Sequence, residues 1–187
     1  YILVKQGGKM NAVGTPDKPI VMTSEKEEPG AWGGIHICGK AHTNAEGGKG
    51  SSEIGGAVYG GNDDADNSGT LQYIRLEYTG FAFDEEHEAN GISFYGVGNG
   101  TIVDHCEAYK GSDDGFEFFG GSVNVSNMVV VSCSDDSFDW TEGWNGKGTD
   151  LVAYQEAKAT LGYDCDCLIE ADNNENDNAA TPVSHPV

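Results

Sequence analysis

The sequence predicts an all-β fold, a right-handed parallel β-helix (β-solenoid), from a repeat, from its strand-like runs and from the lack of helical patterning. The stretches SDDGFEFFGG and SDDSFDWTEG, which begin at Ser112 and Ser134, carry matching residues 22 positions apart (from 112 to 134). Short runs of β-branched and aromatic residues, bounded by Gly, Asn, Asp and Ser, follow one another along the chain. They lie too close together for intervening helices, which excludes an ordinary βαβ arrangement. Such a short period, made only of strands and turns, is typical of a coiled β-solenoid.

Ten segments have the composition of strands in this fold. Their apolar side chains indicate a face turned to a core, and the flanking Gly, Asn or Asp residues indicate tight turns. The expected strands lie within residues 1–9, 18–24, 32–39, 71–80, 90–100, 101–111, 114–121, 126–133, 137–143 and 150–157. One coil carries two or three of them, each paired in parallel with its counterpart in the next coil.

Large apolar residues two positions apart recur at the same place in successive repeats. Side chains at positions i and i+2 point to the same side of a strand, and neighbouring coils lie about 4.8 Å apart. Equivalent side chains are therefore expected to stack inside the helix. The expected interior ladders contain Ile92 and Phe94, Phe116 and Phe118, and Phe138 and Trp140.

Residues 1–187 are expected to form one β-helix segment with two inserted loops, at about 39–69 and 81–89. The first is rich in Gly, Ser and Asn, and the second is acidic. In repeat folds such insertions gather on one face, often the binding face. The chain opens on the strand-like YILVKQGG and ends in NAATPVSHPV, so we expect an interior segment of a longer solenoid.

The net charge of the chain limits the classes of partner that it can bind. It contains 31 Asp and Glu against 10 Lys and Arg, with a formal net charge of −21. Such a surface repels phosphate backbones and anionic lipid headgroups, so we expect no nucleic-acid partner. Divalent cations, cationic partners and uncharged glycans remain open. No apolar run is long enough to predict a transmembrane segment.

The doubled aspartates of the repeat are the first candidate site. Asp113, Asp114, Asp135 and Asp136 are expected at the same corner of successive coils, where unshielded carboxylates would raise one another's pKa. Two interpretations stay open. The side chains accept hydrogen bonds from N–H groups of the turn, or they bind Ca²⁺ between the corners. We take all four as candidate ligand-binding residues.

A second candidate calcium site lies in NDDADNSG, residues 62–69. Asp63, Asp64 and Asp66 supply closely spaced carboxylates before Gly69, like the first half of a calcium loop. The distal Glu of an EF-hand is missing, because the twelfth residue counted from Asp64 is Arg75. The alternative is a solvated turn that leads into the next strand.

Trp32 and Trp144 are candidate sugar-binding residues. An exposed ring beside Asp and Asn side chains can stack on the C–H face of a neutral sugar while oxygens meet its hydroxyls. Trp144 follows the corner at Gly143, and Trp32 begins a strand. The alternative is that both rings cover the coil or its flank.

The cysteines define neither a disulfide framework nor a zinc site. There are five of them, so at least one stays unpaired within this sequence, and the spacing of Cys165 and Cys167 is not that of a zinc site. No catalytic residue is assigned either. The acids have no basic group beside them, and the single arginine is Arg75, whereas enzymes that cleave acidic polysaccharides need a basic group near the acids.

The chain resembles a largely uncharacterised family of cell-surface and secreted right-handed parallel β-helix proteins of Bacteroidota, many of them lipoproteins. Motifs in the family's order cover nearly the whole chain and lie at 14–24, 32–41, 60–80, 90–101, 112–124, 135–147 and 168–177. The resemblance implies an exported protein at the extracellular or outer-membrane surface, with a lipid anchor outside the present sequence. It supplies no catalytic residues.

These observations favour a non-catalytic binding or display protein that engages a glycan or a partner protein at the bacterial surface, with Ca²⁺ as the possible cofactor. A polysaccharide-degrading hydrolase or lyase of β-helix fold is the first alternative. A structural subunit of an outer-membrane assembly is the second.

Overall fold

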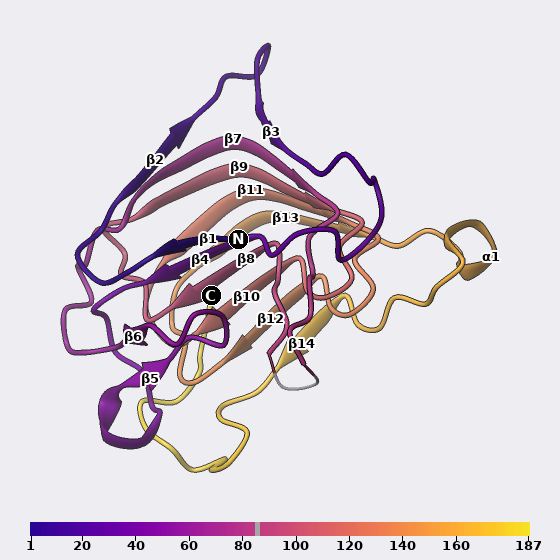
Figure 1. Ribbon diagram of the computed structural model, residues 1–187. Coiled ribbons are helices and arrows are strands. Elements are labelled where there is room, and N and C mark those ends of the chain that lie inside the picture. Colours follow the sequence, from indigo (N-terminus) through magenta and orange to yellow (C-terminus); the bar gives the residue numbers. More distant parts are fainter. Residues whose placement is uncertain (85–86) are drawn as a thin grey trace.

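The chain winds into stacked coils whose strands form two long parallel sheets (Figure 1). The computed structural model describes residues 1–84 and 87–187, so residues 85 and 86 of the expected insertion 81–89 lie outside the described residues. The predicted fold class is confirmed: the protein is a right-handed parallel β-helix. Among the described residues, no helix is both long and apolar enough to cross a bilayer.

The first sheet, called sheet A here, takes one short strand from each coil. Its strands are β1 (Ile2–Val4), β4 (Ile35–Cys38), β8 (Ile92–Tyr95), β10 (Phe116–Phe119), β12 (Phe138–Thr141) and β14 (Ile169–Ala171), in that spatial order. Every neighbouring pair is parallel.

The second sheet, called sheet B, contains longer strands that bend, together with two short ones. In spatial order they are β13 (Gly148–Tyr154), β11 (Asn124–Val131), β9 (Ile102–Tyr109), β7 (Gly69–Glu77) and β2 (Met10–Val13), while β3 (Ile20–Met22) also pairs with β7. Four successive coils each place one residue with φ between 52° and 55° inside the long strand: Tyr73, His105, Asn127 and Asp150. This left-handed residue turns the backbone, so each coil presents two faces on this side.

The core lies between the two sheets and contains the predicted ladders. Phe116 pairs in register with both Ile92 and Phe138. The rings of Phe94 and Phe118 stack with centroids 5.1 Å apart, and those of Phe116 and Phe138 lie 5.8 Å apart. Full burial of each such ring contributes about 2 kcal/mol. The prediction that like side chains stack in columns is therefore confirmed.

The segment 39–69 covers part of the outer face of sheet A. It contains the one-turn η1 (Glu46–Gly48) and the antiparallel pair β5 (Gly50–Ser51) and β6 (Val58–Tyr59). Tyr59 packs with Tyr95 and Phe119, outward residues of sheet A, in a second small core. This loop is consequently held against the coil rather than free in solvent.

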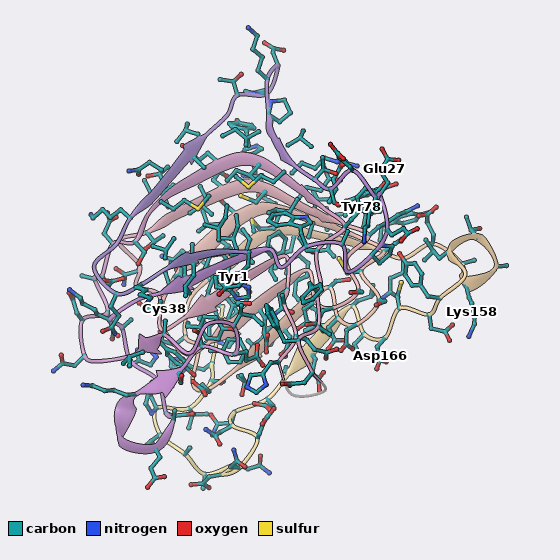
Figure 2. All side chains as sticks on the ribbon, in the orientation of Figure 1. Tyr1, Glu27, Cys38, Tyr78, Lys158 and Asp166 are labelled. Carbon is teal, nitrogen blue, oxygen red and sulfur yellow. The ribbon has the colours of Figure 1, made fainter. Side chains whose placement is uncertain are left out.

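A second excursion leaves the coils between β13 and β14. It carries α1 (Lys158–Leu161), which projects away from the stacked strands (Figure 1). Lys158 lies far out on this arm and Asp166 nearer the coils (Figure 2). Tyr163 fastens the arm, because its hydroxyl donates to the carbonyl of Ser132 at 2.7 Å.

Candidate functional site

The outer face of sheet A carries a row of side chains that alternate with the interior rings. Glu117 lies between Phe116 and Phe118 and pairs in register with Ser93 on one side and Asp139 on the other. Asp139 pairs in turn with Glu170. Because successive residues of a strand point to opposite faces, the row faces outward. It forms an acidic floor in the last three coils.

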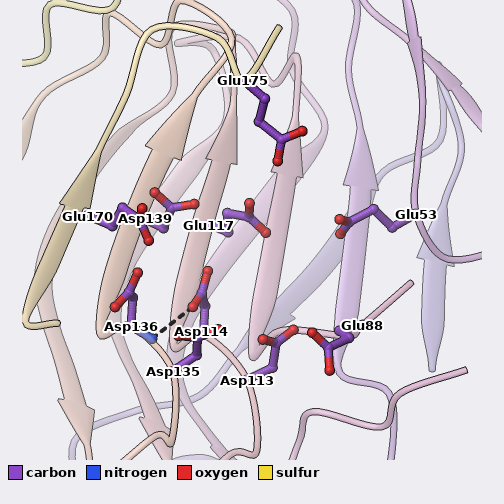
Figure 3. Close-up of a pocket in the computed structure, with 10 residues that line it drawn as sticks. All are labelled: Glu53, Glu88, Asp113, Asp114, Glu117, Asp135, Asp136, Asp139, Glu170 and Glu175. Carbon is purple, nitrogen blue, oxygen red and sulfur yellow. Dashed lines mark hydrogen bonds between the residues drawn. The ribbon is translucent and has the colours of Figure 1, made fainter. Parts of the chain in front are cut away.

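More acids surround this floor (Figure 3). The corner before the strands contributes Asp113, Asp114, Asp135 and Asp136. Three further segments supply the rest of the wall. They place Glu53 from the segment 39–69, Glu88 from the insertion 81–89 and Glu175 from the C-terminal segment. Together they line an open cavity of about 570 Å³, which we call the acidic cavity, and the ten lining residues found in the described part of the chain are all Asp or Glu.

The second aspartate of each pair has an architectural role. The amide of Asp114 donates to Oδ1 of Asn90 at 3.2 Å, and the amide of Asp136 donates to Oδ1 of Asp114 at 2.9 Å. The amide of Cys167 donates to Oδ1 of Asp136 at 2.7 Å. These hydrogen bonds join one coil to the next, whereas the sequence suggested bonds within a single turn. We call this series the corner ladder.

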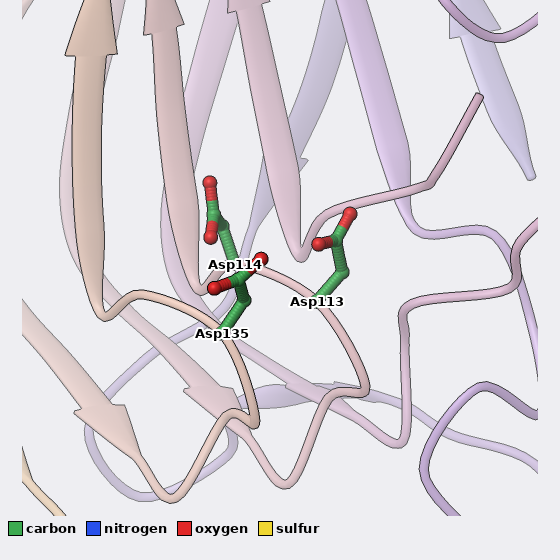
Figure 4. Close-up of side chains that lie close together, drawn as sticks. All are labelled: Asp113, Asp114 and Asp135. Carbon is green, nitrogen blue, oxygen red and sulfur yellow. The ribbon is translucent and has the colours of Figure 1, made fainter. Parts of the chain in front are cut away.

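Two groups of carboxylates have the spacing of metal ligands. One oxygen from each of Asp113, Asp114 and Asp135 lies within 4.8 Å of the others (Figure 4). Asp114, Glu117 and Asp139 form a second group with the same spacing, so Asp114 belongs to both. Carboxylate oxygens are the ligands that Ca²⁺, Mg²⁺ and Mn²⁺ prefer. The residues present therefore fit a hard divalent cation.

Burial and mutual repulsion hold several of these carboxyl groups protonated. Burial, followed by the charges of Glu88 and Asp135, raises the pKa of Asp113 to about 8. Burial next to other acids raises the pKa of Asp114 and of Glu117 well above the usual range. Without a cation, the acidic cavity cannot ionise completely at neutral pH.

The outer parts of the acidic cavity show the same trend. Burial raises the pKa of Glu53 to about 7, although the hydroxyl of Tyr95 donates to its carboxylate. Burial raises the pKa of Asp139 to about 6. A hydrogen bond with Asp136, together with burial, raises the pKa of Glu170 to about 7. Protons and cations therefore compete for the same oxygens.

The two candidate sugar-binding tryptophans lie in different surroundings. Trp144 is only 2% exposed, and its ring stacks on Phe118 with centroids 4.1 Å apart. Its indole N–H donates to the carbonyl of Val123 at 3.2 Å. Trp32 is half-buried and donates to the carbonyl of Glu77 at 2.7 Å. Neither ring lines the acidic cavity, and Trp144 belongs to the core because its N–H finds a backbone acceptor there.

The predicted calcium loop is not assembled as a cluster. Oδ1 of Asp64 accepts hydrogen bonds from the backbone amide and the ring of His42. Asp66 is buried, and its Oδ2 accepts from the hydroxyl of Ser68 at 2.9 Å. Within residues 1–84 and 87–187, the close groups of acids exclude Asp63, Asp64 and Asp66. The alternative interpretation as a turn fits these contacts better.

Six acids of the cavity were not identified from the sequence. Glu117 and Asp139 had a detectable signal, since each alternates with the predicted interior rings and so points outward. Glu53, Glu88 and Glu175 lie in irregular segments, and Glu170 lies in the coil after a break in the repeat. The five cysteines are free thiols, with Cys38, Cys106 and Cys133 buried.

Comparison with known proteins assigns the chain to a family. The family described as "Pectate-lyase like beta helix domain" matches residues 1–187. The chain therefore belongs to the pectate-lyase-like β-helix domains. No curated protein and no solved structure matches it.

Proposed function

We propose that this protein binds a glycan on the outer face of sheet A and that Ca²⁺ in the acidic cavity is required for the binding. The cavity is concave, borders three separate wall segments and has ligand groups for a cation. Membership of the pectate-lyase-like β-helix family supports a carbohydrate ligand. The proposal places the protein at a bacterial outer surface, as the resemblance in its sequence implies.

One observation carries the proposal: the corner ladder does not need negative charge. Its first rung is the neutral amide of Asn90, and the later rungs are Asp114 and Asp136. Asparagine would accept the same hydrogen bond without the cost of a buried carboxylate. The outward row repeats this pattern, because Ser93 occupies the position that Glu117 takes in the next coil. Acidic side chains are therefore concentrated at positions where the fold does not require them.

A bound cation removes the free-energy cost of burying these carboxylates next to one another. Asp113, Asp114 and Asp135 would hold one ion, and Glu117 and Asp139 would share Asp114 to hold a second. When bound, Ca²⁺ neutralises carboxylates and accepts further oxygen ligands, which the hydroxyls of a sugar can supply. Glu53, Glu88 and Glu175 line the rest of the same cavity, where a ligand of the ions would lie.

Binding to a glycan array with and without chelator tests this function. The labelled protein, an Asp113→Asn/Asp135→Asn double variant and an Asp63→Asn control are applied in CaCl₂ and in EDTA. The wild-type protein and the control are expected to bind in CaCl₂ and to lose binding in EDTA. The double variant should bind in neither buffer. Binding that persists in EDTA, or in the double variant, contradicts the proposal.

Cleavage of a polysaccharide is a second candidate, favoured by the pair Glu117 and Asp139. The two carboxyl groups are hydrogen-bonded to each other, and burial raises the pKa of Glu117 well above the usual range and that of Asp139 to about 6. Two acids whose surroundings push their pKa values apart can act as acid and base in one site. Incubation with polysaccharides distinguishes the two functions. A hydrolase releases reducing ends and a lyase releases unsaturated products, whereas a binding protein yields neither.

A further inference from the structure

Part of the C-terminal segment, residues 172–184, forms a strap that meets the coil at the carboxyl end of β12. The strap is fastened at both of its ends. The amide of Asp172 donates to the carbonyl of Trp140 at 3.0 Å, and the hydroxyl oxygen of Ser184 accepts from the amide of Gly143 at 3.0 Å. The residues between these two points leave the coil and return to it.

The strap carries Glu175, whose carboxyl group points into the acidic cavity (Figure 3). Within the strap only Asn174 is buried, and this residue is polar. Because burial of apolar surface is the main force that holds segments together, the strap is held chiefly by hydrogen bonds. Segments of this kind open more readily than the packed core.

Asn174 fixes the turn that contains Glu175. Its Oδ1 accepts hydrogen bonds from the amides of Asn176 at 2.9 Å and Asp177 at 3.0 Å, so the backbone closes around Glu175. Its Nδ2 donates to Oδ1 of Asn44 at 2.9 Å. The position of Glu175 therefore depends on a contact with the segment 39–69.

Asn44 holds the strap from that segment. Its Nδ2 donates to the carbonyls of Asn173 at 2.9 Å and Pro182 at 3.0 Å, and its own amide donates to the carbonyl of Glu142 at 3.0 Å. A cavity of about 400 Å³ lies beside this contact and is lined by both segments, so close packing does not replace these hydrogen bonds. Asn44 does not line the acidic cavity, and any effect that it has on a cation there must pass through the strap.

We propose that the strap closes the acidic cavity over a bound cation, with Glu175 as a ligand carried by the strap and Asn44 as the residue that positions it. This inference rests on the proposed function, because it requires Ca²⁺ in the acidic cavity. Each close group of acids contains three residues, whereas Ca²⁺ takes about six to eight oxygen ligands, so positions remain for Glu175. If closure of the strap raises the affinity for Ca²⁺, Ca²⁺ must favour closure by the same factor.

Calorimetric titration with CaCl₂ alone tests the coupling in a double-mutant cycle. Glu175→Gln and Asn44→Ala are each expected to weaken binding of Ca²⁺ by about fivefold to tenfold. The double variant should bind Ca²⁺ no more weakly than Glu175→Gln, because Asn44 acts only through that carboxyl group. The control Asn178→Ala removes an exposed side chain of the same strap that lines none of these cavities, and it should leave the affinity within about twofold.

Hydrogen exchange measures closure of the strap directly. Saturating CaCl₂ is expected to slow exchange of the Asn176 and Asp177 amides by about fivefold to tenfold in the wild type and to leave it unchanged in Glu175→Gln. Unchanged exchange in the wild type, equal calcium affinity in the wild type and Glu175→Gln, or additive losses in the double variant overturn the inference while leaving the cation site intact. If the wild type does not bind Ca²⁺ at all, the proposed function itself fails.

Discussion

Oδ1 of Asp114 accepts a hydrogen bond from the backbone amide of Asp136, 2.9 Å away in the following coil. This contact distinguishes the two residues of each doubled aspartate. All four residues line the acidic cavity, but only the second residue of each pair, Asp114 or Asp136, also joins coils as a rung of the corner ladder. The repeat therefore serves architecture and places a set of candidate ligands at the same time.

Two substitutions of Asp114 distinguish the contribution of its hydrogen bond to stability from the contribution of its charge. Asp114→Asn keeps an oxygen acceptor for the amide of Asp136 and removes a buried acid, so it is expected to raise the free energy of unfolding in EDTA by on the order of 1–2 kcal/mol. Asp114→Ala also loses the acceptor and should be less stable than Asp114→Asn by about 1–2 kcal/mol. Urea denaturation measures both. A less stable Asp114→Asn protein in EDTA would show that the charge is needed by the fold.

The pH dependence of stability follows from the raised pKa values. In the folded chain the pKa is about 8 for Asp113, about 7 for Glu53 and about 6 for Asp139, each above the value in an unfolded chain. Groups of this kind stabilise fully below about pH 4 and lose that contribution as the pH rises through the folded values. In EDTA, the free energy of unfolding should therefore fall between pH 4 and pH 8.

Calcium should reduce this fall in the free energy of unfolding with pH, because the cation replaces the protons that leave the acidic cavity. Urea denaturation across the same pH range, in CaCl₂ and in EDTA, makes the comparison. Maximal stability at pH 8 in EDTA would contradict the account of the acidic cavity.

The sequence predicted the ladders well because alternation and repeat are local properties. Phe116 and Phe138 occupy equivalent positions in the two matching stretches, and parallel pairing of coils brings equivalent residues into register. The shared corner of Asp113 and Asp135 followed from the same register. The inward orientation of Trp144 could not be predicted in this way, because the repeat does not specify whether a ring after a corner points into the core. Its contact with Phe118 depends on the shape of the core.

The positions of the remaining acids of the cavity could not be predicted from the repeat. Glu53 and Glu175 are far apart in the chain and belong to no repeat, yet both line the acidic cavity. Their positions depend on how the segment 39–69 and the C-terminal segment fold back over sheet A. Asn44 is one such link, because its side-chain amide donates to the carbonyl of Asn173 at 2.9 Å. No periodicity encodes contacts of this kind.

The stacked rings should dominate the stability of the coil. Phe118 is 1% exposed and lies between Phe94 and Trp144. Phe118→Ala is expected to lower the free energy of unfolding by about 3–5 kcal/mol, because it leaves a cavity in a packed column. The control Phe83→Ala removes a ring that is 55% exposed and should change stability by about 0.5 kcal/mol or less. Similar losses in both variants, measured by urea denaturation, would contradict the assigned core.

Asp104 should show the opposite pH behaviour on sheet B. It accepts hydrogen bonds from Gln72, Ser126 and Asn127, and these, with its contact to His105, lower its pKa to about 2. Its contribution is present above about pH 4 and is lost as the pH falls towards 2. Asp104→Ala is expected to reduce stability by about 1–2 kcal/mol at pH 7 and by less at pH 2.5. A loss that does not depend on pH would assign the effect to packing alone.

Calorimetric titration with CaCl₂ alone, in two buffers of different ionisation enthalpy at pH 7.5, tests the central claim most directly. The account predicts that Ca²⁺ binds, that binding releases protons from the acidic cavity, and that Asp114→Asn weakens it while Asp63→Asn does not. Absence of binding, or calcium affinity that is equal in the wild type and Asp114→Asn, would contradict it.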